Sequence, residues 1–302
     1  MSKNKRVNLT VKETGLILKK AFLNFKNNDP LRIAAATAFF GTFAIPAILV
    51  VILQIFGVFL NRKNFGLSIT NKLEHIIGPG PASEIRHILV NLLGIGENWF
   101  FTSLMFLFLI FVSTTLFVII RNSINQLWCI VVNDNTGFYF NLKQRFKSLA
   151  IITLGGFLLL IAFAFEGARL FLETTIENTI PVLNGFVNEL VFFITTTLWF
   201  CIAFKFIANG RPLWKPVIIS SVFTGILLTI GKLVMRKLLL SSNINEIYGT
   251  SGAILLVMLF IFYSSFIFYY GASLVNAISE EQNTPITSSG YAHKIRTQEV
   301  KD

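Results

Sequence analysis

Five ionisable residues lie within or beside long apolar stretches of the sequence: Glu166, Arg169, Glu189, Lys232 and Arg236. A charged side chain in hydrocarbon costs at least about 2.5 kcal/mol, so such residues usually face a cavity or a partner. Glu166 and Arg169 are three residues apart, and on a helix they share one face and can neutralise each other. These two acids and three bases would line an outward-facing vestibule for an anionic or amphiphilic substrate. The alternative is that they are helix-end charges whose flexible side chains extend to the lipid headgroups.

Residues able to hold a metal ion or to act as nucleophiles are sparse along the chain. The three histidines, His75, His87 and His293, form none of the spacings that metal enzymes use. Cys129 and Cys201 are far apart, so they indicate neither a disulfide framework nor a paired metal site. The sequence also has no glycine-rich phosphate loop. We therefore expect no catalytic residues, no cofactor, no metal and no enzymatic activity, and a membrane enzyme stays only as a third alternative.

The composition indicates that these residues are positioned by helices in a lipid bilayer. Of the 302 residues, 54% are hydrophobic and only 14% are charged, whereas an ordinary soluble domain has about 25% charged residues. A transmembrane helix needs about 20 mostly apolar residues, and six stretches meet this requirement. They are Ile33–Leu60, Trp99–Ile120, Ser148–Phe165 with a polar extension to Phe171, Leu190–Phe204, Leu213–Gly231 and Gly252–Ile278. The predicted fold is an all-α bundle of six transmembrane helices with short amphipathic helices at the interfaces.

The distribution of basic residues predicts the orientation of this bundle. The net charge is +11, and 18 of the 26 Lys and Arg residues fall in the segments that would share one side with both termini. Cytoplasmic loops carry such an excess, so we expect both termini in the cytoplasm. The sequence before Gly15 lacks the apolar region of a cleavable signal, so the first span would direct insertion. We divide the chain into a cytoplasmic amphipathic segment (1–32), a transmembrane domain (33–278) and a disordered polar tail (279–302).

Three connecting segments have the pattern of interfacial helices. Thr10-Val11-Lys12-Glu13 has the pattern of a capping box, and Asp29-Pro30 would end the helix that starts there. The apolar face of that helix comprises Val11, Ile17, Leu18, Ala21, Phe22 and Phe25. Such a helix would lie on the inner membrane surface or pack on the bundle, and both alternatives stay open. A second helix is expected after Pro81-Ala82-Ser83, and a third, carrying Lys143, Arg145 and Lys147, after the polar turn 133–137.

Small residues at four-residue intervals predict close helix packing. Ser221, Gly225 and Thr229 form one such stripe, and helices in lipid approach each other through small residues. Ala34, Ala38, Thr42 and Pro46 form another in the first span. Pro46 removes one backbone hydrogen bond, so it is a candidate hinge as well as a packing residue.

Four segments together resemble the YihY/BrkB family of bacterial inner-membrane proteins, over about residues 15 to 280. They are AAATAFFGTFAIPAIL (Ala34–Leu49), NSINQLW (Asn122–Trp128), YGTSGA (Tyr248–Ala253) and FYSSFIFYYGA (Phe262–Ala272). The last two are the most specific, and they add Tyr248, Gly249 and Gly271 as candidate hinge or packing residues. One departure is Phe260, where relatives commonly have Trp.

The resemblance implies a multi-pass protein of the bacterial inner membrane with a role in the cell envelope. It also brings the label ribonuclease BN, which the residues do not support because they form no metal site. We expect a transporter or a protein that handles lipids or other amphiphiles, with membrane lipids and a small amphiphilic or anionic substrate as partners and no nucleic acid. The alternative is a non-transporting membrane scaffold that organises the envelope.

Overall fold

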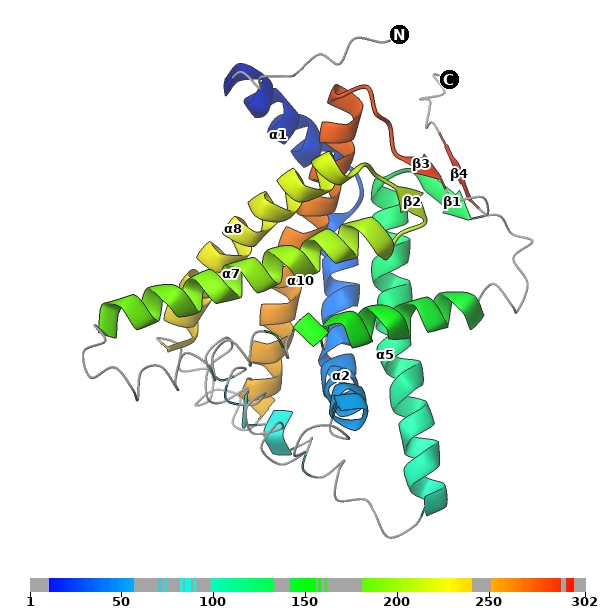
Figure 1. Cartoon of the computed structure of the whole chain (residues 1–302), viewed down its shortest axis with the longest axis vertical. Coiled ribbons are helices and arrows are strands. Elements are labelled where there is room, and N and C mark those ends of the chain that lie inside the picture. The colour runs from blue at the N-terminus through cyan, green and yellow to red at the C-terminus, as the bar shows by residue number, and fades with distance from the viewer. Residues whose placement is uncertain are drawn as a thin grey trace.

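The chain folds into a mostly helical bundle, which is described from a computed structural model (Figure 1). The structure describes residues 11–56, 99–132, 142–155, 181–240, 251–288 and 292–295, with single positions between 71 and 90 and at 157, 158 and 161. The helices are α1 (Val11–Lys26), α2 (Pro30–Phe56), α5 (Trp99–Leu127), α7 (Pro181–Phe206), α8 (Trp214–Leu240) and α10 (Ser251–Glu281). Residues 142–155 form a further helical segment. Four short strands complete the described elements: β1 (Ile130–Val132), β2 (Gly210–Arg211), β3 (Thr287–Ser288) and β4 (Ala292–Lys294).

Four stretches within these helices are long and apolar enough to cross a bilayer. They are Ile110–Leu127, Glu189–Phe206, Trp214–Val234 and Ile254–Glu281. These stretches fall in the second, fourth, fifth and sixth predicted spans, which are confirmed as apolar helices. The first predicted span coincides with α2, whose apolar part is Pro30–Ile45. The third lies partly outside the described residues, and its first part belongs to the helical segment 142–155.

Helix α10 is the centre of the bundle. It packs along α2 on one side and along α8 on another, while α5 packs on α2 and α7 packs on α8 (Figure 1). The arrangement is therefore two helix pairs, α2–α5 and α7–α8, joined through α10. Helix α7 packs mainly on α8 and touches α10 only slightly. The α7–α8 pair therefore has little direct contact with the rest of the bundle through α7 itself. The helical segment 142–155 lies across α5 (Figure 1).

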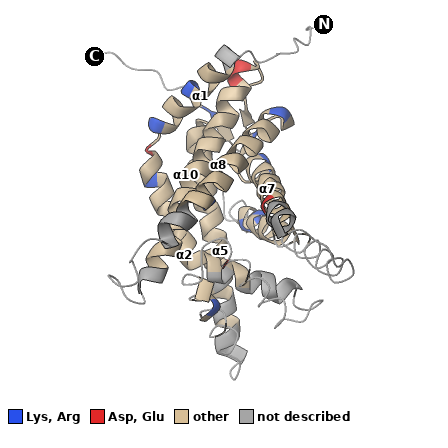
Figure 2. Ribbon diagram, turned by 90° about the vertical axis from the view of Figure 1, so that its left-hand side faces the viewer, with Lys and Arg blue, Asp and Glu red and all other residues tan. Residues whose placement is uncertain are grey.

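The outer faces of the helices are apolar, as expected for contact with lipid. Helix α5 exposes Leu104, Leu107, Phe108 and Phe111, and α7 exposes Leu190, Ile194 and Leu198. Figure 2 shows the Lys and Arg residues gathered mainly toward the end of the molecule that carries α1, with long uncharged stretches along α2, α5 and α10. An apolar belt below a basic end is the distribution of a membrane protein.

The amphipathic N-terminal helix forms where the sequence predicts it. Helix α1 begins at Val11 and ends at Lys26, Asp29 adopts a left-handed backbone (φ 50°), and Pro30 begins α2. Ile17 and Ala21 are buried against Leu274, Ala277 and Ile278 of α10, so this face packs on the bundle. Phe22, which belongs to the predicted apolar face, is 54% exposed, and Leu16 and Leu23 are exposed beside it. The helix therefore packs on the bundle and also presents apolar side chains outward.

The polar tail differs from its prediction. Residues 279–302 are predicted to be disordered, yet β3 pairs with β2 and β4 pairs with β1 in antiparallel register. That prediction was wrong for the described part of the tail. The physical reason is Ile286, which is buried against Gly210, while the short strand β1 offers an unpaired edge to β4. One buried apolar residue and an edge strand order this segment without any apolar period in its sequence.

Candidate functional site

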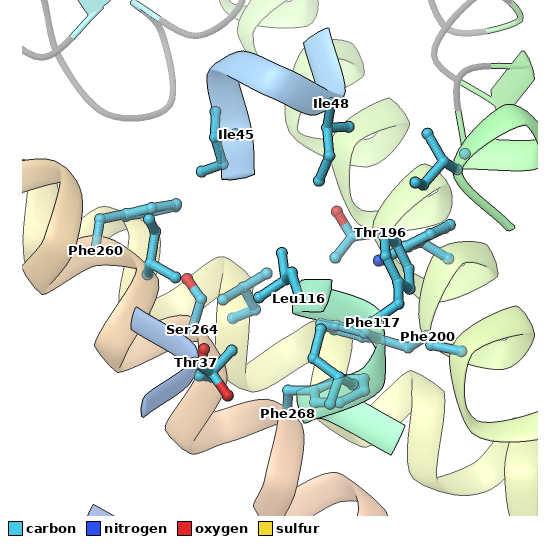
Figure 3. A pocket seen from close by; sticks show the side chains of 18 of the residues that line it. Thr37, Ile45, Ile48, Leu116, Phe117, Thr196, Phe200, Phe260, Ser264 and Phe268 are labelled. Atoms are coloured by element: carbon cyan, nitrogen blue, oxygen red, sulfur yellow. The ribbon is translucent and has the colours of Figure 1, made fainter. Parts of the chain in front are cut away.

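An apolar cavity of about 490 Å³ lies between the two helix pairs, with α10 as one wall (Figure 3). Helices α2, α5, α7, α8 and α10 and the helical segment 142–155 all contribute to its lining. As the described residues form it, the cavity is partly enclosed. Its volume falls in the range of about 300–1,000 Å³ that is usual for small-molecule and cofactor sites.

The lining of this cavity is aliphatic and aromatic, with a few hydroxyl groups. Phe117, Phe200 and Phe268 supply rings from α5, α7 and α10, and Ile45 and Ile48 close the α2 side (Figure 3). The hydroxyl groups belong to Thr37, Thr195, Thr196, Ser264 and Ser265. Among the described residues that line it, none is charged. This lining suits hydrocarbon chains far better than ions or sugars.

One lining hydroxyl lacks a partner among the described residues. The Ser264 Oγ atom is buried and has no hydrogen-bond partner there, whereas the Thr37 hydroxyl shares a bond of 2.5 Å with the Tyr269 hydroxyl. A buried hydroxyl without a partner is unfavourable, so a polar atom of an occupant would be stabilised there. Trp199 of α7 meets Phe117 of α5 edge to face, with 6.4 Å between ring centroids, and this contact joins the two helix pairs.

A polar network lies beside the cavity at its α1 end. The Arg121 Nη1 atom donates to Gln144 Oε1 at 2.7 Å, and Gln144 Nε2 donates to Asn209 Oδ1 at 3.2 Å. The Asn209 backbone N–H in turn donates to Asn125 Oδ1 at 3.0 Å. Three cavity-lining residues come from the same segments: Ile120 from α5, Ile152 from the helical segment 142–155, and Ile207 from the turn between α7 and β2. This network is thus adjacent to the α1 end of the apolar cavity.

Two of the five predicted site residues come together in the structure. The Lys232 Nζ atom donates to Glu189 Oε2 at 2.5 Å and lies 4.0 Å from the centre of the Phe192 ring. Neither residue lines the cavity, although Phe192 does. Glu166, Arg169 and the side chain of Arg236 lie outside the described residues, so convergence of all five stays a prediction.

Of the candidate hinge and packing residues, Gly225 and Gly271 have described surroundings. A Cβ atom added at Gly225 would meet Thr197 and Phe193 of α7, and one added at Gly271 would collide with Thr224 and Phe204. The backbone of α8 and of α10 therefore approaches its neighbours more closely than any larger residue would permit. Pro46 lies within α2, and its side chain is outside the described residues, as are Tyr248 and Gly249.

The described residues offer no alternative centre for metal chemistry. Among them, no group of three or more His, Cys, Asp or Glu side chains is placed to hold a metal ion. Cys129 and Cys201 are free thiols and are partly buried.

One known protein family matches nearly the whole chain. The family described as Virulence factor BrkB matches residues 21–295, which is nearly the whole sequence. The chain belongs to the BrkB family. Together with its long apolar helices, this membership identifies an α-helical membrane protein and confirms the predicted resemblance. No curated protein and no solved structure matches this BrkB-family chain.

Sequence reasoning missed both the cavity and the polar network of this BrkB protein. It looked for charge at membrane depth, whereas the cavity is built from ordinary apolar residues that resemble any packed interior. The network could have been suspected from Arg121, a charged residue inside an otherwise apolar stretch and just before NSINQLW.

Proposed function

We propose that this BrkB-family protein binds an amphiphilic molecule of the cell envelope by its hydrocarbon part and moves it within the bacterial inner membrane. The single observation that carries the proposal is the apolar cavity of about 490 Å³ between the α2–α5 and α7–α8 pairs. A water-filled pathway for ions would need polar lining, and the described residues around this cavity offer only a few hydroxyl groups.

The arrangement of helices supports movement as well as binding. Helix α7 packs mainly on α8, so the α7–α8 pair is able to shift as a body relative to α2–α5. Gly225 permits close approach of α8 and α7, so it would hold this pair together during such a shift. Gly271 permits close approach of α10 and α8, which is a surface along which the pair would move. In this proposal the chain crosses the membrane six times, and the basic end that carries α1 faces the cytoplasm.

The experiment uses the Trp199 fluorophore, which lines the cavity. The variant Trp99→Phe/Trp214→Phe keeps only Trp128, which is fully buried outside the cavity lining, and Trp199. Bromine atoms on acyl chains quench tryptophan on contact. Reconstitution with brominated phosphatidylcholine is expected to quench Trp199 and to leave Trp128 emission intact.

Cavity filling provides the matched control. Thr196→Phe places a ring in the cavity, whereas Leu198→Phe makes the same kind of addition on the outward face of α7. We expect Thr196→Phe to abolish both the quenching and the movement of a fluorescent lipid between leaflets of vesicles, and Leu198→Phe to retain both. Equal behaviour of the two variants would overturn the proposal.

The scaffold alternative is supported by helix α1. This helix is fixed to the bundle by the Lys20–Glu281 ion pair at 2.7 Å, and it still exposes Leu16, Phe22 and Leu23. A scaffold would lose its role on deletion of residues 1 to 28 and would be insensitive to Thr196→Phe. Comparison of these two variants therefore separates the alternatives.

A further inference from the structure

Three basic side chains converge at the α1 end of the bundle, from elements far apart in sequence. Arg121 comes from α5, Lys147 from the helical segment 142–155, and Arg211 from β2. Arg121 is held by Gln144, which lies one helical turn before Lys147 and therefore on the same face of its helix. Gln144 is also bonded to Asn209, two residues before Arg211. The network bonds Arg121 to the two segments that carry Lys147 and Arg211, and the charges of Arg121 and Arg211 act on the Lys147 ammonium.

The charges of these three residues are not compensated within the described part of the chain. Its ion pairs use other bases, namely Lys20, Arg32, Lys232 and Lys294, and no described carboxylate lies within 4 Å of Arg121, Lys147 or Arg211. Arg121 is only 9% exposed, and its guanidinium has five N–H groups, of which one is bonded to Gln144. Burial of a charged side chain without an opposite charge is costly. An anion that occupied the space would remove this cost.

The electrostatics of Lys147 agree with this arrangement. Burial, followed by the nearby charges of Arg121 and Arg211, lowers the pKa of Lys147 to about 8. The ammonium is therefore predominantly charged at neutral pH, and it is destabilised by two further cations. Arg145 adds a fourth positive charge beside Arg121, held by a 2.8 Å hydrogen bond to Thr114 Oγ1 and by the Phe111 ring at 4.6 Å.

We propose that Arg121, Lys147 and Arg211 form a binding site for a phosphate-type oxyanion at the α1 end of the bundle. Guanidinium groups bind such oxyanions with two parallel hydrogen bonds, and a lysine ammonium adds a point charge. The anion is either a phospholipid headgroup or free phosphate, because both present the same oxygens. The site is adjacent to Ile120 and Ile207 of the apolar cavity, yet it does not depend on the proposed function, since phosphate alone can occupy it.

The test titrates the full chain in neutral detergent with inorganic phosphate, followed by calorimetry. We expect saturable binding that becomes about tenfold weaker in Lys147→Gln and in Arg211→Gln, because each variant removes one charged donor. Arg121→Lys keeps the charge and is expected to retain binding with a smaller loss. Lys215→Gln is the matched control, since Lys215 is an exposed base close to Arg211 in sequence and outside the site. Its affinity is expected to equal that of the wild type.

A second arm identifies the source of the anion. The protein is placed in nanodiscs of phosphatidylglycerol and phosphatidylcholine, and retained lipid is counted by native mass spectrometry. If phosphatidylglycerol is retained by the wild type and lost in Lys147→Gln and Arg211→Gln, the site is supported and its anion is a lipid headgroup. If phosphate binds and no lipid is preferred, the site is supported and its anion is free phosphate. The proposal is overturned if neither probe binds, or if both variants match Lys215→Gln. Thr196→Phe is expected to leave phosphate binding unchanged. Failure of the proposed amphiphile binding in the cavity is therefore distinguishable from failure of the oxyanion site.

Discussion

The Trp128 indole N–H donates a hydrogen bond of 2.8 Å to the backbone carbonyl of Ala272. Trp128 ends the segment Asn122–Trp128, and Ala272 ends the segment Phe262–Ala272, two of the segments that carry the resemblance to the family. Residues 144 positions apart are thus joined directly, at the α1 end where α5 meets α10. The two motifs are therefore parts of one structural joint, which explains their occurrence together in physical terms.

Replacement of Trp128 by Phe should destabilise the protein markedly. The indole is completely buried, so the variant loses a hydrogen bond and leaves a cavity, for a combined cost of about 2 kcal/mol or more. Thermal unfolding in detergent measures the effect. Trp214→Phe is the control, because Trp214 is 52% exposed and a surface change of this kind costs little. Equal melting temperatures for the two variants would contradict the assigned role of the bond.

Sequence reasoning identified the apolar helices because lipid imposes a strong compositional requirement on them. α1 was also predictable, since the capping residues before Val11 and the Asp29-Pro30 end mark its limits. The cavity was not predictable, because residues such as Ile48 and Phe200 have the same types in a packed core and in a cavity wall. The ordered tail was missed because long-range pairing of β4 with β1 leaves almost no local signal.

The tail should contribute to stability through Ile286, which is buried beside Gly210. Ile286→Ala removes a buried branched side chain, so we expect a loss of about 2–4 kcal/mol and earlier cleavage of the tail by protease. The control is Ile295→Ala, because Ile295 is 45% exposed. A tail that is cleaved equally fast in the wild type and in Ile286→Ala would show that this contact does not hold it.

Two glycine substitutions should change stability in opposite directions. A Cβ atom at Gly271 would collide with Thr224 and Phe204, so Gly271→Ala is expected to destabilise by about 1–3 kcal/mol. A Cβ atom at Gly15 of α1 meets nothing within 4 Å, so Gly15→Ala should stabilise by about 0.5–1 kcal/mol through its higher helix propensity. Both are measured as shifts in melting temperature. A neutral Gly271→Ala variant would mean that α8 and α10 are not held as closely as described.

Because of Lys147, the stability of the folded protein should rise with pH, whereas its affinity for phosphate should fall. Its pKa is about 8 in the folded protein, whereas an ordinary lysine has a pKa near 10.5. Between these values the unfolded chain retains a proton that the folded protein has released, so folded-state stability rises with pH across this window. Phosphate binding should instead weaken above about pH 8, as the ammonium is lost.

The measurement compares wild type with Lys147→Met from pH 7 to 10.5. The melting-temperature difference between the two is expected to shrink as pH rises, because removal of the buried charge stabilises the variant only where the wild type is still protonated. Lys215→Met controls for general effects of removing a lysine, since Lys215 is exposed. Parallel curves for wild type and Lys147→Met would contradict the lowered pKa.

The Glu189–Lys232 pair should be asymmetric in its response to mutation. The Lys232 side chain is only 7% exposed, whereas that of Glu189 is 40% exposed. Glu189→Ala leaves a buried ammonium beside the Phe192 ring without its carboxylate and is expected to cost about 2 kcal/mol or more. Lys232→Met leaves a half-exposed carboxylate and an apolar side chain in an apolar place, so its cost should be well below that of Glu189→Ala. The double variant should be more stable than Glu189→Ala alone, and additive losses would show that the two residues are not coupled.

The same variants decide whether this pair belongs to a substrate vestibule. If Lys232 attracts an anionic substrate, Lys232→Met, inserted and folded normally, should lose substrate movement in vesicles, while Lys232→Arg should retain part of it because the charge persists. If the pair only fixes α7 to α8, both variants should move substrate at the wild-type rate and differ only in melting temperature. Arg169→Ala extends the test to the residue that the sequence places at the same depth. Normal movement in Lys232→Met and Arg169→Ala together would exclude the vestibule and leave the apolar cavity as the pathway.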